Sequence, residues 1–231
     1  MRWIHDGLYL LIAYLLGSIP IGLFVVRAYT GKDIRQEHSG RTGGTNVLRV
    51  AGLGPGLLTV IGDFGKAVLA VHLAGKSLLN PDWLQVIAGI FVILGHNYSL
   101  FLLERVDGRW RMRGGAGGIS TMGAAAALWP GTILVTLPLG AGLLYGLGYA
   151  SVGTMSIALS ASIIFLVRAL LGHGPWAFLA FGIMAELLLL WELRPNIKRL
   201  ASGTERMVGW RARRRKKGSK PNHQIHDGAA S

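Results

Sequence analysis

Apolar stretches long enough to cross a lipid bilayer constrain this chain more than any other feature. They can be read at about 8–27, 53–74 and 84–103, each close to the ~20 residues that span about 30 Å of hydrocarbon as a helix. Half of the chain is apolar (51%), only 15% is charged, and the mean hydropathy is +0.44. Soluble globular proteins rarely have such a composition. The sequence therefore predicts an all-α integral membrane protein.

The stretch from Ile119 to Leu193 is apolar but repeatedly interrupted. Its interruptions are Pro130, a glycine cluster between Gly140 and Gly153, and the sequence Gly172-His173-Gly174-Pro175. Glycine and proline at such positions are typical of turns. This stretch is therefore predicted to form four shorter helices rather than two long ones.

Positive charge sets the expected orientation. The polar segments 27–49, 104–118 and the tail from Arg194 carry most of the 24 Lys and Arg residues, and basic loops remain on the cytoplasmic side. An N-terminus outside and an odd number of spans satisfy this rule. We therefore expect about seven transmembrane helices and a cytoplasmic C-terminus, with five spans as the alternative. The run from Leu8 to Val26 has no Ala-x-Ala cleavage pattern, so it is expected to be a retained span rather than a signal peptide.

Directly after the first span, the segment Ser39–Arg49 combines hydroxyls, glycines, an amide and two guanidinium groups. Glycines let backbone N–H groups approach an anion, hydroxyls add short donors, and arginine matches phosphate oxygens. This pattern predicts a phosphate site at the bilayer surface, and Arg49 is the best candidate for binding the phosphate. The alternative is a solvated polar loop that only orients the topology. Thr45 and Asn46 lie where the next helix should start, so either is also a candidate N-cap.

Other polar residues interrupt the apolar stretches. Asp63 and Lys66 are one helical turn apart, so they can neutralise each other, either as a structural ion pair or as part of a site. His96 is a candidate either for a hydrogen-bonded packing residue or for a residue in the wall of the site. The glycine run Gly114–Gly118 lacks the Gly-Lys-Ser/Thr of a P-loop, but backbone amides at a helix start can bind phosphate. Because the three basic segments share one membrane face, we expect one composite site.

Three groups of residues, in order along the chain, resemble the signatures of a known family. The first group is Ser39, Gly40, Gly43, Thr45, Asn46 and Arg49. The second is Gly95-His96-Asn97 followed by Gly114-Gly115-Ala116-Gly117. The third is Arg194, Asn196, Ile197, Arg199, Leu200, Gly203 and Glu205, and Asp63 with Lys66 matches an Asp-x-x-Lys pair. Over about residues 8–207, the chain resembles the PlsY family, the bacterial membrane glycerol-3-phosphate acyltransferases that use acyl-phosphate.

The resemblance implies a seven-helix fold with an active site open to the cytoplasm. It implies transfer of a fatty acyl group from acyl-phosphate to the 1-hydroxyl of glycerol 3-phosphate, which gives lysophosphatidic acid and phosphate in phospholipid synthesis. The residues to which it points are Ser39, His96 and Asn196 for catalysis, Gly43, Thr45, Asn46, Arg49, Gly114, Gly115, Gly117 and Arg199 for substrate binding, and Asp63, Lys66 and Glu205 for support. No metal or cofactor is expected. Because phosphate is a good leaving group, Ser39 is expected to donate a hydrogen bond to a phosphate oxygen rather than to act as a nucleophile.

The chain also departs from the family pattern. Ala116 stands where a lysine is expected, Leu193 where a histidine is expected, Arg41 where an asparagine is usual, and Gly44 where an alanine is usual. Losing a lysine beside two phosphates removes a full positive charge, so Arg113 is expected to bind substrate in its place. The alternative is a non-catalytic or altered-substrate relative that binds phosphorylated lipid precursors. A third hypothesis is a transporter of organic anions. A transporter would need a continuous polar path between the two membrane faces, whereas this sequence concentrates its polar residues on one side.

The domain organisation is expected to be simple. Residues 1–207 form one transmembrane acyltransferase domain, and residues 208–231 form a polybasic, disordered cytoplasmic tail. We expect this tail to lie on anionic lipid headgroups in the inner (plasma) membrane, and no nucleic-acid partner is expected because no aromatic pattern accompanies the charge. The chain has no Cys, which excludes disulfides, Cys-ligated zinc and thiolate catalysis.

Overall fold

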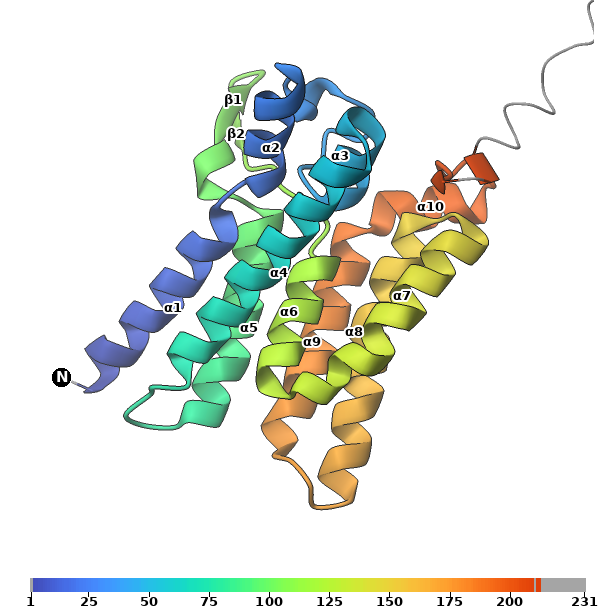
Figure 1. Ribbon diagram of the computed structural model, residues 1–231. Coiled ribbons are helices and arrows are strands. Elements are labelled where there is room, and N and C mark those ends of the chain that lie inside the picture. The colour runs from blue at the N-terminus through green and yellow to red at the C-terminus, as the bar shows by residue number, and fades with distance from the viewer. Residues whose placement is uncertain (1, 210, 213–231) are drawn as a thin grey trace, which may run out of the picture.

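The computed structural model describes residues 2–209 and 211–212, and it is built mainly of long helices that run along one common direction (Figure 1). In chain order the helices are α1 (Arg2–Ser18), α2 (Ile21–Thr30), η1 (Ile34–Gln36), α3 (Gly44–Ala51), α4 (Leu53–Ala74), α5 (Pro81–Asn97), η2 (Leu100–Leu102), α6 (Gly118–Leu128), η3 (Pro130–Thr132), α7 (Ile133–Leu147), α8 (Ala150–Leu170), α9 (Trp176–Glu192) and α10 (Arg194–Ala201). Two short strands, β1 (Glu104–Val106) and β2 (Arg109–Arg111), lie between η2 and α6.

The three predicted spans of the first half correspond to helices in the structure. The predicted span 53–74 coincides with α4, and 84–103 corresponds to Pro81–Leu102, which is α5 continued by η2. The first span extends over Arg2–Thr30 and is divided into α1 and α2 at Ile19–Pro20. Proline has no backbone N–H and clashes with the preceding turn, which accounts for the break.

The interrupted stretch forms four helices, as predicted: within Gly118–Glu192, which is fully described, the chain folds into α6, α7, α8 and α9. Its breaks occur at Pro130, at Gly148 in a left-handed conformation, and at Gly172–Pro175. Among the described residues, five helical segments are long and apolar enough to cross a membrane, and six if α9 and α10, which meet at a 65° bend, count as one. The short α6 has 11 residues, roughly 16 Å of helix, so length alone does not make it a span.

The basic segments gather at one end of the helix bundle. Figure 1 shows α2, α3, the β1–β2 hairpin and α10 at the same end, whereas the N-terminus lies at the opposite end. The predicted convergence of the three polar segments is therefore correct. The predicted tail lies largely outside the described residues.

Glycines bring the first and fifth helices into backbone contact. A β-carbon built at Gly17 would lie 2.3 Å from the Val92 carbonyl oxygen, and one at Gly95 would lie 2.2 Å from the Tyr14 carbonyl oxygen. Such close approach is a common way to pack helices in lipid, where apolar burial gives little driving force. This contact fixes the end of α5 that carries His96.

The β1–β2 hairpin is a departure from the expected all-α fold. Its strands pair antiparallel, with Glu104 opposite Arg111 and Val106 opposite Arg109. The turn residues Asp107 and Gly108 have φ of 51° and 76°, the left-handed values that a two-residue hairpin turn requires.

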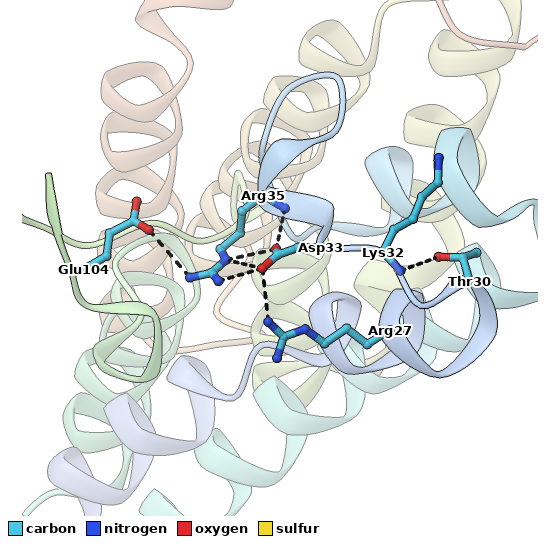
Figure 2. Close-up of polar contacts among 6 residues, drawn as sticks. All are labelled: Arg27, Thr30, Lys32, Asp33, Arg35 and Glu104. Carbon is cyan, nitrogen blue, oxygen red and sulfur yellow. Dashed lines mark hydrogen bonds and ion pairs between the residues drawn. The ribbon is translucent and has the colours of Figure 1, made fainter.

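A charged cluster ties this hairpin to the loop after α2 (Figure 2). Arg35 donates hydrogen bonds to Asp33 from its backbone N (3.0 Å), Nε (3.0 Å) and terminal NH2 (2.6 Å), and Arg27 donates to the same carboxylate at 3.1 Å. The Arg35 hydrogen bonds hold the pKa of Asp33 well below its ordinary value, against the effect of burial. Arg35 also reaches Glu104 of β1, with 3.6 Å between NH1 and Oε2. The cluster therefore braces the segment that leads to Ser39.

Candidate active site

The loop before α3 is held by the side chain of Asn46. Its Nδ2 donates to the carbonyl oxygens of Glu37 (3.1 Å) and Arg41 (2.9 Å), and the residue is 3% exposed. The N-cap of α3 is Gly43, with no side-chain cap. The interpretation of Thr45 or Asn46 as an N-cap is therefore wrong, because the helix starts earlier and the Asn46 amide binds the loop carbonyls instead.

The glycine turn packs against the end of α5. Gly115 N donates to the His96 carbonyl oxygen at 2.9 Å, and Thr42 N donates to the Gly114 carbonyl oxygen at 3.1 Å. A β-carbon at Gly114 would lie 2.0 Å from the His96 carbonyl oxygen, and one at Gly115 would lie 1.9 Å from His96 Nε2. The turn thus joins α5 to the loop before α3, and only glycine fits there.

Behind this turn, Asp63, Lys66 and His96 form a buried charged group. Lys66 Nζ lies 2.8 Å from Asp63 Oδ1 and 3.0 Å from His96 Nδ1, and it donates to the Ile19 carbonyl oxygen at 3.0 Å. The predicted pairing of Asp63 with Lys66 is correct. His96 Nδ1 also lies 3.5 Å from Asp63 Oδ1. Because the contact with Lys66 is shorter and an ammonium can only donate, we assign Nδ1 as the acceptor and the ring proton to Nε2, the nitrogen beside Gly115.

After α9, the carboxylate of Glu205 positions two residues of α10. Asn196 Nδ2 donates to Glu205 Oε1 at 2.6 Å, and Arg199 Nε donates to Oε2 at 3.3 Å. Glu205 is 6% exposed, so its charge depends on these partners. These two hydrogen bonds are consistent with the supporting role that we expect for Glu205.

These groups surround one cavity of about 480 Å³. The predicted site residues that line it are Ser39, Gly43, Thr45, Asn46, Arg49, Asp63, His96, Gly117, Asn196, Arg199 and Glu205. Its apolar part is lined by Met122, Leu137, Leu144 and Ile157 from α6, α7 and α8. The cavity therefore joins the polar end of the bundle to the apolar helices.

Four predicted site residues do not line the cavity. Lys66, Gly114 and Gly115 lie behind its wall, in contact with His96. Arg113 lies outside it as well, with its Nε 3.0 Å from Glu104 Oε1 in the hairpin. The expectation that Arg113 replaces the missing lysine stays a prediction, since in this structure Arg113 pairs with Glu104 and does not line the cavity.

Two arginines that the sequence did not assign to the site, Arg41 and Arg206, also line the cavity. The terminal NH2 of Arg41 donates to the Glu192 carbonyl oxygen at 2.9 Å and lies 3.1 Å from Glu192 Oε1. Burial lowers the pKa of Arg41 from its usual value, and Glu192 opposes that shift. Burial likewise lowers the pKa of Arg49, with a further contribution from Arg206. Arginine nevertheless remains charged at neutral pH, so the polar end of the cavity is cationic.

Comparison with known proteins gives a consistent result. A family model described as glycerol-3-phosphate acyltransferase matches residues 7–203. A glycerol-3-phosphate acyltransferase of Thermus thermophilus is 40% identical over 206 residues, which are 89% of this chain and 96% of that protein. Glycerol-3-phosphate acyltransferase 2 of Moorella thermoacetica is 39% identical, covering 88% of this chain and 97% of that protein.

A solved structure is similar in fold to this chain. The glycerol 3-phosphate form of PlsY, an integral membrane glycerol 3-phosphate acyltransferase, superposes with a TM-score of 0.74 at 30% identity, covering 89% of this chain and 96% of that chain. The lysophosphatidic acid form of PlsY gives a TM-score of 0.73. From the family match and these relatives, we conclude that the chain belongs to the glycerol-3-phosphate acyltransferase family.

Proposed function

We propose that this protein transfers a fatty acyl group from acyl-phosphate to the 1-hydroxyl of glycerol 3-phosphate, which gives lysophosphatidic acid and phosphate and begins phospholipid synthesis. The observation that carries the proposal is the composition of the cavity described above. Arginines and hydroxyls line one part of it and aliphatic side chains line the other. Such a cavity suits two phosphorylated head groups beside one hydrocarbon chain.

The proposed reaction does not require a protein nucleophile. The 1-hydroxyl oxygen attacks the carbonyl carbon of acyl-phosphate, a new ester C–O bond forms, and the bond between that carbon and the phosphate oxygen breaks. The hydroxyl proton leaves with the departing phosphate. Since phosphate is already a good leaving group, positioning and stabilisation of negative charge supply most of the rate.

The geometry supports distinct roles for the lining residues. Arg49, with the hydroxyls of Ser39 and Thr45 from the same segment, which also line the cavity, binds the phosphate of glycerol 3-phosphate. His96 donates from Nε2 to an oxygen at the reacting centre, because its Nδ1 is occupied by Lys66. Asn196, held by Glu205, orients the acceptor, and Gly117 presents the start of α6 to the donor phosphate.

The same proposal includes the arrangement in the membrane. We infer seven crossings, with the short α6 counted as one, an outside N-terminus and a cavity open to the cytoplasm. The gathering of basic segments at the cavity end supports this orientation through the positive-inside rule. In a bacterium this membrane is the inner (plasma) membrane, and the basic tail contacts its anionic lipids.

Turnover and one substitution test the function. Purified protein in lipid is given palmitoyl-phosphate and labelled glycerol 3-phosphate, and labelled lysophosphatidic acid is measured. We expect product with the native protein and a rise of about 10- to 100-fold in the KM for glycerol 3-phosphate in Arg49→Ala, because a charge-assisted contact is worth about 1.5–3 kcal/mol.

The outcomes separate the proposed enzyme from its alternative. Absence of lysophosphatidic acid above background, from protein that remains folded, would contradict the enzyme and favour a binding relative. Arg105→Ala is the matched control, because Arg105 is exposed on the hairpin and does not line the cavity.

A further inference from the structure

The glycine turn beside the cavity carries no cation of its own. Ala116 and Gly117 line the cavity, and they offer a methyl group and backbone atoms. The proposed reaction, on which this inference rests, brings two phosphates into the cavity. Two phosphates close together repel each other strongly unless cations lie between or beside them, so a second charge is needed away from Arg49.

Arg41 lies next to this turn. The residue that follows it donates from Thr42 N to the Gly114 carbonyl oxygen at 3.1 Å. One residue further, a β-carbon at Gly43 would lie 4.0 Å from the Gly115 α-carbon. The loop that carries Arg41 is therefore packed along the turn, and Arg41 and Ala116 line the same cavity.

The guanidinium of Arg41 is held in place by Glu192 but keeps donor groups for a further hydrogen-bond partner. Its terminal NH2 contacts the carbonyl and the carboxylate of Glu192, whose side chain is 18% exposed against 23% for Arg41. Arginine has five N–H donors. Among the described residues, the recorded side-chain hydrogen bonds of Arg41 use only NH2, which leaves Nε and NH1 for an anion.

The other arginines of the cavity are placed differently. Arg49 donates to the Arg206 carbonyl oxygen at 3.4 Å, and Arg206 donates to the His38 carbonyl oxygen, so these two lie together. Arg199 is engaged by Glu205 through Nε at 3.3 Å. Arg41 is thus the cavity arginine tied by its own loop to the glycine turn.

We propose that Arg41 supplies the positive charge that Ala116 lacks and binds the phosphate of the acyl donor beside the glycine turn. Glu192 is its positioning partner, which holds the guanidinium at the end of α9 while the donor is absent. The donor phosphate then accepts hydrogen bonds from Nε or NH1 of Arg41 and from backbone N–H groups at the start of α6.

The test compares the two substrates in one variant. In Arg41→Ala, the KM for palmitoyl-phosphate should rise about 10- to 100-fold, as expected for one lost charge-assisted contact. The KM for glycerol 3-phosphate should change less than about 3-fold, because Arg49 is intact. Adding Ala116→Lys to Arg41→Ala should lower the KM for palmitoyl-phosphate again, since it returns a cation to the turn. An unchanged donor KM in Arg41→Ala, or no rescue by Ala116→Lys, would overturn the proposal.

A second variant separates binding from a structural role. If Arg41 served only to pair with Glu192, Glu192→Gln and Arg41→Ala would raise the donor KM equally and lower the melting temperature equally. We expect Glu192→Gln to raise the donor KM less than Arg41→Ala does, because the guanidinium remains and can still donate to the carbonyl oxygen of residue 192. Equal increases in the two variants would contradict the inference.

A binding measurement keeps this inference distinct from the proposed function. Hexadecylphosphonate mimics the donor but cannot transfer an acyl group, and its affinity can be measured by titration with the native protein and with Arg41→Ala. A 10-fold or larger loss of affinity supports the inference even if no turnover is found, whereas equal affinities overturn it even if the native protein is active.

Discussion

At the scale of single residues, the position of Gly115 leaves no room for a methyl group. A β-carbon there would lie 1.9 Å from His96 Nε2, and the imidazole is fixed on its other side by Lys66. We expect Gly115→Ala to displace the ring and lower kcat/KM at least roughly 100-fold, as for a misplacement of about 1 Å at a reacting centre. Kinetics with palmitoyl-phosphate and glycerol 3-phosphate measure this loss.

The matched control is Gly146→Ala in α7. A β-carbon at Gly146 meets nothing within 4 Å, so alanine there should leave kcat/KM unchanged and add up to about 1 kcal/mol of helix stability. Full activity of Gly115→Ala would show that His96 does not act at the reacting centre.

Most of the site residues predicted from the sequence line the cavity, but Arg41 was not among them. Ser39, Thr45 and Arg49 could be predicted because they share one short motif rich in hydroxyl and guanidinium groups. Whether Arg41 or Arg113 reaches the glycine turn depends on loop packing and on partners distant in the chain, Glu192 for the first and Glu104 for the second. Sequence spacing does not encode such contacts. The density of arginine around the first motif was the available signal.

At the scale of elements, the Asp33 cluster makes the loop before the site depend on one carboxylate. Asn in place of Asp33 keeps the oxygen that caps η1 but loses the charge that pairs with Arg27 and Arg35. We expect Asp33→Asn to destabilise residues 31–43 by about 1–2 kcal/mol. Hydrogen exchange of the backbone amides in this segment measures the effect.

The pH dependence of the same segment follows from the lowered pKa of Asp33. A carboxyl group whose pKa is lower in the folded state stabilises that state above its ordinary pKa of 3.8 and loses this effect as pH falls toward the lowered value. Protection attributable to Asp33, taken as the difference between the native protein and Asp33→Asn, should be constant from pH 8 to about pH 5 and should fall below about pH 4. A difference that is already lost at pH 6 would contradict this assignment.

Helices were more predictable than the hairpin. Pro130 and the Gly172–Pro175 stretch interrupt apolar runs, and helices end at both places because proline and glycine act locally. The hairpin lacks alternating apolar residues, since charged side chains occupy most of Glu104–Arg111. Its recognisable signal was the Asp107-Gly108 pair, a common two-residue turn that can be seen in the sequence.

At the scale of the whole molecule, the number of crossings depends on α6. The chain has no Cys, so single cysteines can be introduced and labelled without a background. We expect Arg109→Cys to react with an impermeant maleimide only from the cytoplasmic side, and Lys76→Cys only from the opposite side. Pro130→Cys, after α6, should react from the same side as Lys76→Cys if α6 crosses the membrane. Intact cells compared with inverted vesicles give the measurement.

Labelling of Pro130→Cys from the cytoplasmic side would show that α6 does not cross the membrane and that there are fewer than seven crossings. The sequence could predict an all-helical membrane protein because apolar content is a property of the whole chain. It could not fix the count, since α6 is built of small residues, nine of whose 11 are buried in protein, and such a helix need not have the length or hydropathy of a lipid-facing span.

The cavity that joins arginines to aliphatic side chains gives the proposed reaction two supply routes. Glycerol 3-phosphate arrives from water, so its availability is a concentration per volume. The acyl donor is dissolved among lipids, so its availability is a mole fraction of the bilayer. Lysophosphatidic acid remains in the lipid phase while phosphate returns to water. In the proposed reaction the protein is therefore an interfacial catalyst. Its rate follows the surface density of the donor, and it responds to membrane growth because new lipid dilutes that donor.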